Sequence, residues 1–290
     1  MPSGHLTPAT ASPAAEIAPL EIRLLGRVEL SVAGREIRLA SRGAQALIAL
    51  LALKPRVRSR EAVATEIWPD GEGSGTSASL RQALWLVRSS FAAAAVALDQ
   101  YLTIDAEVIG LSSCAPVDLD VARFEAALRG STAVPEEAIA IYHGDLVECL
   151  GLECFAVEAE RLSDAYEDAL ALVAERRLVA GDPIGARDVA ERLLARDPLR
   201  EEAHVTLLRV HGQVGSRAQV VRQYRRLTQL LADELGVDPL PETAAAYHAA
   251  MAETVERSRA RAGALAFAPG ATGSGRRIRS GGLVPSAAHR

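Results

Sequence analysis

The clearest alternation of apolar and polar positions in the chain lies between residues 77 and 91. Large apolar side chains recur there at i, i+4, i+7 and i+11, namely Leu80, Leu84, Val87 and Phe91. This spacing predicts a helix with one buried stripe. A second stripe repeats the spacing about 100° further round the helix, beside Gln82, and consists of Arg81, Trp85 and Arg88. The segment is therefore expected to be buried on one face and polar on the next.

The segments around this helix predict an ordered series of short elements. Alternating positions before it indicate three strands, over residues 20–25, 28–32 and 35–39. Helical spacing then indicates two helices, over 44–53 and 60–68, the second capped by Ser59. Two apolar runs after it, 101–104 and 108–111, predict a β-hairpin. This order is the plan of a winged helix-turn-helix, whose third helix enters the DNA major groove.

From Asp118 onwards the pattern is almost wholly helical, and Asp118 is expected to cap the first helix. Gly181–Leu194 lines up with Gly215–Thr228 at an offset of 34 residues. A period of 34 with paired helices is typical of tetratricopeptide repeats. The Asp-Pro pairs at 197–198 and 238–239 are expected to end the corresponding helices.

The predicted fold class is an α+β N-terminal winged helix-turn-helix followed by an all-α tetratricopeptide-like domain. Four parts are expected along the chain: a disordered arm (1–19), the winged-helix DNA-binding domain (20–115), the helical domain (116–255) and a disordered basic tail (256–290). The arginines of the tail either add weak attraction to DNA or reflect only solubility or neutral drift.

Charge and composition narrow the class of protein. The net charge of −5 argues against a protein that coats nucleic acid without specificity. Residues 20–115 are about neutral, with a local basic cluster at Lys54, Arg56, Arg58 and Arg60. Three cysteines without a CxxC pair, no long apolar run and no secretion signal predict a cytoplasmic protein with free thiols and no membrane contact.

The chain carries no motif that indicates an enzyme. It contains no Walker A sequence, GxGxxG, HExxH or GxSxG. His143, Asp145 and Glu148 fall in a helix-dominated region and are interpreted as solvated surface groups rather than acid–base catalysts. Cys149 and Cys154 alone make a poor metal site. Neither catalysis, a cofactor nor a metal is therefore expected.

Several stretches in this order resemble the actinobacterial antibiotic-regulatory activators, called SARP proteins, which carry a bacterial transcriptional activation domain. The matching stretches are Leu24–Leu30, Gly43–Leu53, Ile67–Asp70, Ser79–Leu84, Val117–Glu125, Tyr142–Leu146 and Leu231–Pro239. The resemblance implies sequence-specific promoter binding and recruitment of RNA polymerase, usually at genes of secondary metabolism. It also implies a cytoplasmic, nucleoid-associated protein.

For a DNA-binding helix, the residues have separate expected roles. Arg81 is the candidate for a bidentate contact to guanine and Gln82 for adenine. Ser77 and Ser79 offer hydroxyl and backbone N–H groups to a phosphate. The backbone is expected to be held by Arg88, Lys54, Arg56, Arg58 and Arg60. Trp85 either packs against the wing or a partner or contacts a sugar edge, and we favour packing. The competing role for Arg81 is a surface salt bridge.

The helical domain is expected to bind protein, because stacked helix pairs form concave grooves. Its candidate partners are a second protomer, which gives a homodimer on DNA, and RNA polymerase. The alternative is an adaptor that does not bind DNA and uses the winged helix as a rigid spacer. The near-neutral charge of residues 20–115 favours this alternative.

Overall fold

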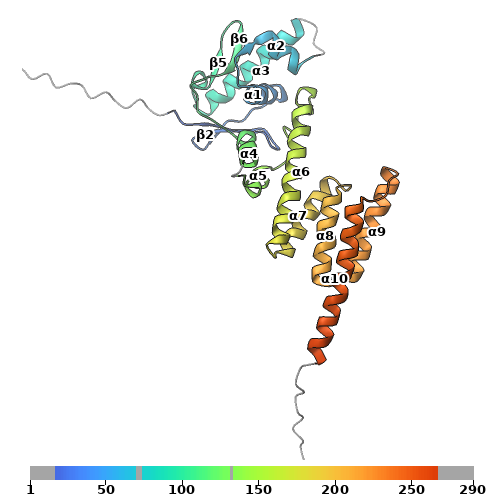
Figure 1. Ribbon diagram of the computed structural model, residues 1–290. Helices are drawn as coiled ribbons and strands as arrows, with labels where there is room; N and C mark the ends of the chain where they lie inside the picture. The colour runs from blue at the N-terminus through green and yellow to red at the C-terminus, as the bar shows by residue number, and fades with distance from the viewer. Residues whose placement is uncertain (1–16, 70–73, 131–132, 267–290) are drawn as a thin grey trace, which may run out of the picture.

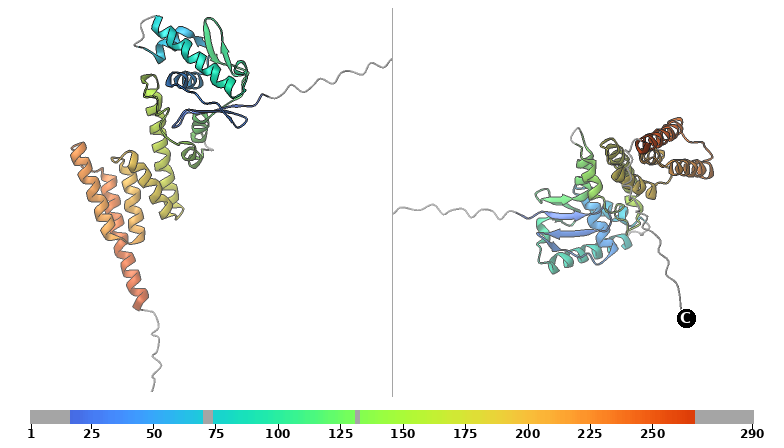
Figure 2. Two further views of the ribbon diagram at one scale, coloured as in Figure 1. Left: turned by 180° about the vertical axis from the view of Figure 1, so that it is seen from behind. Right: turned by 90° about the horizontal axis from the view of Figure 1, so that it is seen from below.

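The computed structural model describes residues 17–69, 74–130 and 133–266. They form a winged helix-turn-helix followed by a stack of helices, and the long helix α6 (Ala156–Val179) runs from one to the other (Figure 1). Two further views show the stack extending away from the winged helix (Figure 2). Helices α3 (Ser74–Ala93) and α10 (Pro241–Ala266) therefore lie toward opposite ends of the molecule.

A four-stranded sheet opens the winged helix. Its strands are β1 (Leu20–Arg23), β2 (Glu29–Val32), β3 (Arg35–Glu36) and β7 (Val117–Leu119), in the order β3-β2-β1-β7. β1 pairs antiparallel with β2 and parallel with β7 on its other edge. The sequence pattern predicts the first three strands but not β7, because three residues are too few to show an alternation.

Three helices and a second sheet complete the winged helix. Helices α1 (Arg42–Leu53) and α2 (Arg60–Ile67) pack against each other and against α3. The predicted hairpin is present as β5 (Leu102–Ile104) and β6 (Val108–Leu111), preceded by the short 3-10 helix η1 (Leu98–Gln100). The unpredicted strand β4 (Arg58–Ser59) pairs with β6 and gives a three-stranded wing.

Local chemistry explains where α1 and α2 begin. The Oγ of Ser41 accepts a hydrogen bond from the backbone N–H of Ala44, at 3.1 Å. The Oγ of Ser59 accepts one from Ala62, at 3.2 Å, as the sequence predicts. Such caps satisfy helix donors that have no partner within the helix, and each is worth about 1 kcal/mol.

The second half of the chain is helical. Besides α6 and α10 it contains a short 3-10 helix, η2, and five α-helices: η2 (Glu153–Phe155), α4 (Asp120–Leu128), α5 (Pro135–Ile141), α7 (Pro183–Arg196), α8 (Glu201–Val214) and α9 (Arg217–Glu234). Successive helices of this part pack side by side from α4 to α10.

The predicted 34-residue repeat is present in this stack. Helices α7 and α9 begin 34 residues apart, at Pro183 and Arg217. Each follows a glycine with positive φ, 80° at Gly181 and 79° at Gly215. Glycine adopts this conformation without a Cβ clash and therefore ends the preceding helix at the same place in both repeats.

Three local predictions are wrong. Asp118 does not cap a helix but lies in β7, and α4 begins at Asp120. Helix α9 ends at Glu234, before the Asp-Pro pair at 238–239, at a left-handed glycine. Residues 256–266, expected to be disordered, continue α10, because alanine and arginine favour helix and extend one that is already packed.

The two expected disordered ends are only partly described. Residues 1–16 and 267–290 lie outside the described residues, as do 70–73 of the loop before α3. The last residues of the expected arm, 17–19, are ordered: the backbone oxygen of Ala18 accepts a hydrogen bond from the Tyr101 hydroxyl, at 2.8 Å.

One apolar core runs from the winged helix into the helical stack. It includes Leu20 and Leu84 of the winged helix and Phe124 and Leu170 of the helices that follow. Burial of shared apolar surface therefore couples the two parts. None of the described helices combines the length and the apolarity that crossing a bilayer requires. The described residues also bring together no group of three His, Cys, Asp or Glu side chains able to hold a metal.

Candidate nucleic-acid interface

Helix α3 is anchored by its apolar stripe. Its four members are at most 2% exposed: Leu80, Leu84, Val87 and Phe91. Burial of each such side chain contributes about 1.5–3 kcal/mol. The stripe faces α1 and α2, as predicted, and this packing fixes which side of α3 points outward.

The outward side of α3 carries the predicted readers. Arg81, Gln82 and Arg88 are exposed, and neither arginine has an ion-pair partner among the described residues. The described part of the chain therefore supplies no surface salt bridge that competes for Arg81. Trp85 lies between the two arginines along the helix and is 64% exposed.

Trp85 does not pack against the wing. It borders a hollow of about 380 Å³ on the opposite flank of α3, whose other walls include Glu36, Arg38 and Ser89. The favoured prediction that Trp85 packs against the wing is therefore wrong, because the ring is largely exposed and the hollow beside it has no wing residue among its walls. Contact with a partner remains a prediction.

The two serines near the start of α3 differ. Ser77 is exposed, and its hydroxyl has no hydrogen-bond partner among the described residues. The Oγ of Ser79 donates to the backbone oxygen of Gly75, at 3.1 Å. Because a hydroxyl has one hydrogen to donate, Ser77 is the better placed of the two to donate to a phosphate oxygen.

The wing turn lies next to the start of α2. Arg60 Nη1 donates to the backbone oxygen of Asp105, at 3.0 Å, and the Arg60 N–H donates to Glu107 O, at 2.9 Å. The Asp105 carboxylate accepts from the N–H groups of Val108 and Glu107, which hold its pKa below the usual range. A hollow of about 620 Å³ separates this turn from α3, with Arg60 and Arg81 among its walls.

The basic cluster of residues 54–60 is partly neutralised by an acidic residue that the sequence analysis missed. Glu66 on α2 pairs with Lys54 at 2.5 Å and with Arg58 at 2.6 Å. Partial burial opposes ionisation of Glu66, but hydrogen bonds from these two cations hold its pKa below the usual range. Arg56 is exposed and has no partner in the described part of the chain. Among the described residues, only Arg56 and Arg60 of the cluster are therefore free of an ion pair.

A second missed residue, Asp120, joins the helical stack to the winged helix. Its carboxylate accepts hydrogen bonds from the backbone N–H groups of Leu24 and Leu25, at 2.9–3.0 Å, and from that of Val121, at 2.8 Å. Asp120 is only 8% exposed, and burial raises its pKa although these hydrogen bonds oppose the shift. An aspartate directly after an apolar β segment is the available sequence signal, but it does not reveal the partners.

The segment after α5 adds a second link. The N–H of Gly26 donates to the backbone oxygen of Asp145, at 3.0 Å. The Asp145 side chain pairs with Arg196 of α7 at 2.5 Å and accepts from the Tyr142 hydroxyl at 2.9 Å. Burial disfavours its ionised form, but these partners hold the pKa of Asp145 below the usual range. Asp145 is thus a structural residue.

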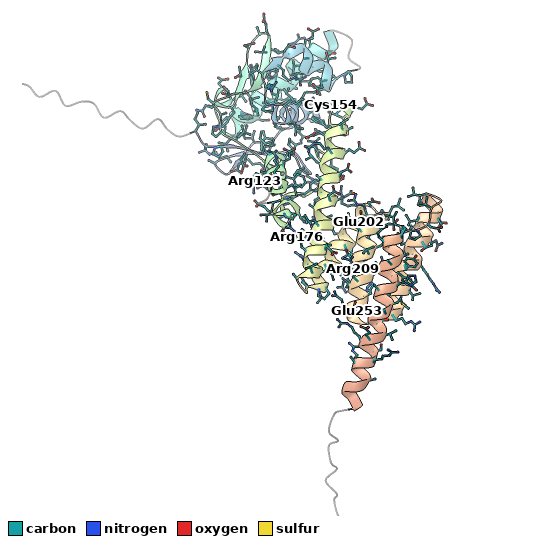
Figure 3. All side chains as sticks on the ribbon, in the orientation of Figure 1. Arg123, Cys154, Arg176, Glu202, Arg209 and Glu253 are labelled. Atoms are coloured by element: carbon teal, nitrogen blue, oxygen red, sulfur yellow. The ribbon has the colours of Figure 1, made fainter. Side chains whose placement is uncertain are left out.

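The connection between the winged helix and the helical stack continues through side chains along the stack (Figure 3). Cys154, just before α6, lies beside the winged helix, whereas Arg209 lies on α8 in the middle of the stack. Arg209 Nη1 contacts both carboxylate oxygens of Glu175 on α6, at 2.8 Å. The position of α3 is therefore connected to the helical stack through buried contacts and ion pairs between neighbouring helices.

Comparison with known proteins agrees with this architecture. Residues 119–250 match the family model of the bacterial transcriptional activator domain. The transcriptional regulatory protein MoaR1 of Mycobacterium tuberculosis is 26% identical over 244 residues, which are 79% of this chain and 78% of MoaR1. The chain is thus similar to transcriptional regulators, and its helical part matches their activator domain. MoaR1 of Mycobacterium bovis matches the chain to the same extent, 26% over 243 residues.

A solved structure shows that the fold of this chain is shared. Mycobacterium tuberculosis EmbR, determined in complex with a low-affinity phosphopeptide, superposes with a TM-score of 0.66 at 21% sequence identity. The match covers 86% of this chain and 70% of EmbR. It thus includes most of both the winged helix and the helical stack.

Proposed function

We propose that this chain is a SARP-type, sequence-specific DNA-binding activator of transcription. The observation that carries the proposal is the outward face of α3, where Arg81 and Gln82 are exposed and Arg81 has no ion-pair partner in the described chain. A helix held by a buried stripe presents such side chains to base edges without a cost for breaking existing ion pairs.

Each group has a distinct task in this proposal. Arg81 donates two hydrogen bonds to guanine O6 and N7, and Gln82 pairs with adenine; each contact gives about 1–3 kcal/mol of discrimination. Ser77 donates to a phosphate near the start of α3. Arg88, Arg56 and Arg60 hold the backbone, whereas Lys54 and Arg58 stay with Glu66. Three phosphate contacts per protomer predict a salt slope of about −3.

Two protomers are proposed to bind promoter repeats as a dimer. Their α3 helices then enter successive major grooves, about 10 base pairs apart. The helical stack extends away from α3, which leaves it accessible to RNA polymerase when the winged helix is on DNA (Figures 1 and 2). The genes controlled are proposed to be those of secondary metabolism, and the protein acts in the cytoplasm at the nucleoid.

A mobility-shift experiment with the full chain tests the proposal. Duplexes are first selected from a random pool, and binding is then compared for the wild type, Arg81→Ala and Arg225→Ala. Arg225 is an exposed arginine on α9, remote from α3, and is a matched control for loss of one charge. Sequence-specific binding that Arg81→Ala weakens about tenfold or more and Arg225→Ala preserves supports the proposal; binding indifferent to sequence refutes it.

One observation favours the alternative, an adaptor that does not bind DNA. Glu66 neutralises two of the four cations of the 54–60 cluster, and the wing turn carries Asp105 and Glu107. Both features reduce attraction for phosphate. The adaptor predicts that no duplex is selected from the random pool, while a stable complex forms with a protein partner.

A further inference from the structure

Trp85 is the one large apolar residue of α3 that is exposed, among the side chains that the structure describes. About two thirds of it, 64%, is open to solvent. The wing does not cover it, and the hollow beside it leaves one side of the ring free. An indole in this position has apolar surface to bury against whatever α3 meets.

The helix places Trp85 in line with the two unpaired arginines. It follows Arg81 by four residues, which is about 6 Å along the helix axis and about 40° round it. It precedes Arg88 by three residues, so the three side chains form one continuous stripe at i, i+4 and i+7. A surface that binds Arg81 therefore also meets Trp85.

The polar atoms around Trp85 are arranged so that its ring N–H stays available. The Oγ of Ser89 donates to the Trp85 backbone oxygen, at 2.9 Å, so this hydroxyl is turned toward the helix. The indole N–H has no hydrogen-bond partner among the described residues. Trp85 thus offers an apolar ring and one donor, and an indole has no acceptor.

In the major groove, thymine has the complementary pair of groups. It presents the C5-methyl, the apolar group of the four standard bases, next to the O4 acceptor. Cytosine presents an amino donor at the same place, which faces the indole N–H unfavourably. We propose that Trp85 reads a thymine through its methyl group and O4. This inference rests on the proposed DNA-binding function.

The spacing along α3 also predicts where this thymine lies. A displacement of about 6 Å corresponds to about two base-pair steps of 3.4 Å. The thymine is therefore expected about two base pairs from the guanine that Arg81 contacts. The recognised half-site contains both bases at this fixed separation.

Base analogues in a selected duplex test the inference. Each thymine is replaced in turn by deoxyuridine, which removes only the methyl group, and by 5-methylcytosine, which keeps the methyl but exchanges O4 for an amino donor. At one thymine per half-site, deoxyuridine is expected to weaken wild-type binding about fourfold, the value of one buried methyl group. 5-Methylcytosine is expected to weaken it further.

Variants of α3 connect the effect to the indole. Trp85→Ala is expected to bind the thymine and deoxyuridine duplexes equally. Trp85→Phe is expected to keep the methyl effect but to lose most of the discrimination against 5-methylcytosine. Arg225→Ala, on α9 and remote from α3, is the control and keeps the full deoxyuridine effect. Both positions, 85 and 225, are exposed, so the variants are expected to fold.

Other outcomes overturn the inference in distinguishable ways. If Trp85→Ala retains the deoxyuridine effect, or if no thymine shows one while Arg81→Ala still weakens binding, Trp85 is not the reader although the proposed function stands. If Trp85→Ala weakens binding equally on every duplex, the ring contacts the backbone or a second protomer instead. If the wild type selects no sequence, the proposed function fails together with the inference.

Discussion

Replacing Asp120 with alanine is expected to loosen the junction between the winged helix and the helical stack. The change leaves the backbone N–H groups of Leu24 and Leu25 without acceptors, although both residues are at most 3% exposed. Each buried, unpaired N–H costs about 1–3 kcal/mol, or about 2–6 kcal/mol for the two. Relief of the buried carboxylate, whose pKa is raised by burial, offsets part of this cost. The net loss of unfolding free energy is expected to be about 3 kcal/mol.

Urea unfolding followed by far-ultraviolet circular dichroism measures this loss. Asp118→Ala is the matched control: it removes a carboxylate two residues away, whose ion pair with Arg123 is 3.8 Å long and solvent-exposed. Such a pair is worth at most about 1 kcal/mol. If Asp120→Ala changes the unfolding free energy by no more than Asp118→Ala does, Asp120 does not join the two parts.

Three further substitutions test the neutralised basic cluster, the buried histidine of α8 and the apolar stripe under α3. Glu66→Gln releases Lys54 and Arg58, and fluorescence anisotropy on random duplex DNA is expected to show tighter binding, with a salt slope steeper by up to about 2. His204 is buried, and burial lowers its pKa, so only the unfolded chain takes up its proton near pH 6.5. Stability is therefore expected to fall as pH drops through about 6.5, and urea midpoints should fall less in His204→Gln. Leu84→Ala opens a cavity under α3 and is expected to cost about 2–5 kcal/mol in thermal or urea unfolding.

The sequence predicts well those features that repeat over short distances. The stripe from Leu80 to Phe91 and the 34-residue period depend on local spacing, and the structure confirms both. Contacts between distant segments are what the sequence does not reveal. Asp120 meets Leu24 across 96 residues, and Glu66 meets Lys54 only because α1 and α2 pack side by side.

The same limit applies to the candidate interface. The outward position of Arg81 follows from the buried stripe and is predicted correctly. The sequence does not predict which cations of the 54–60 cluster are free to bind phosphate, because this depends on which carboxylates the fold brings near them. The helical extension of α10 over residues 256–266 was also missed, since composition alone does not show that a packed helix continues into a basic segment.

The most direct test of the central claim is the contact between Arg81 and guanine N7. In a selected duplex, each guanine is replaced by 7-deazaguanine, which lacks that acceptor, and affinities are compared for the wild type and Arg81→Ala. Replacing one guanine per half-site is expected to lower the affinity of the wild type about tenfold, the value of one hydrogen bond to a charged group. The account predicts no loss at that guanine with Arg81→Ala. An equal loss in both proteins, or no sensitive guanine in the wild type, would contradict the claim that α3 reads DNA through Arg81.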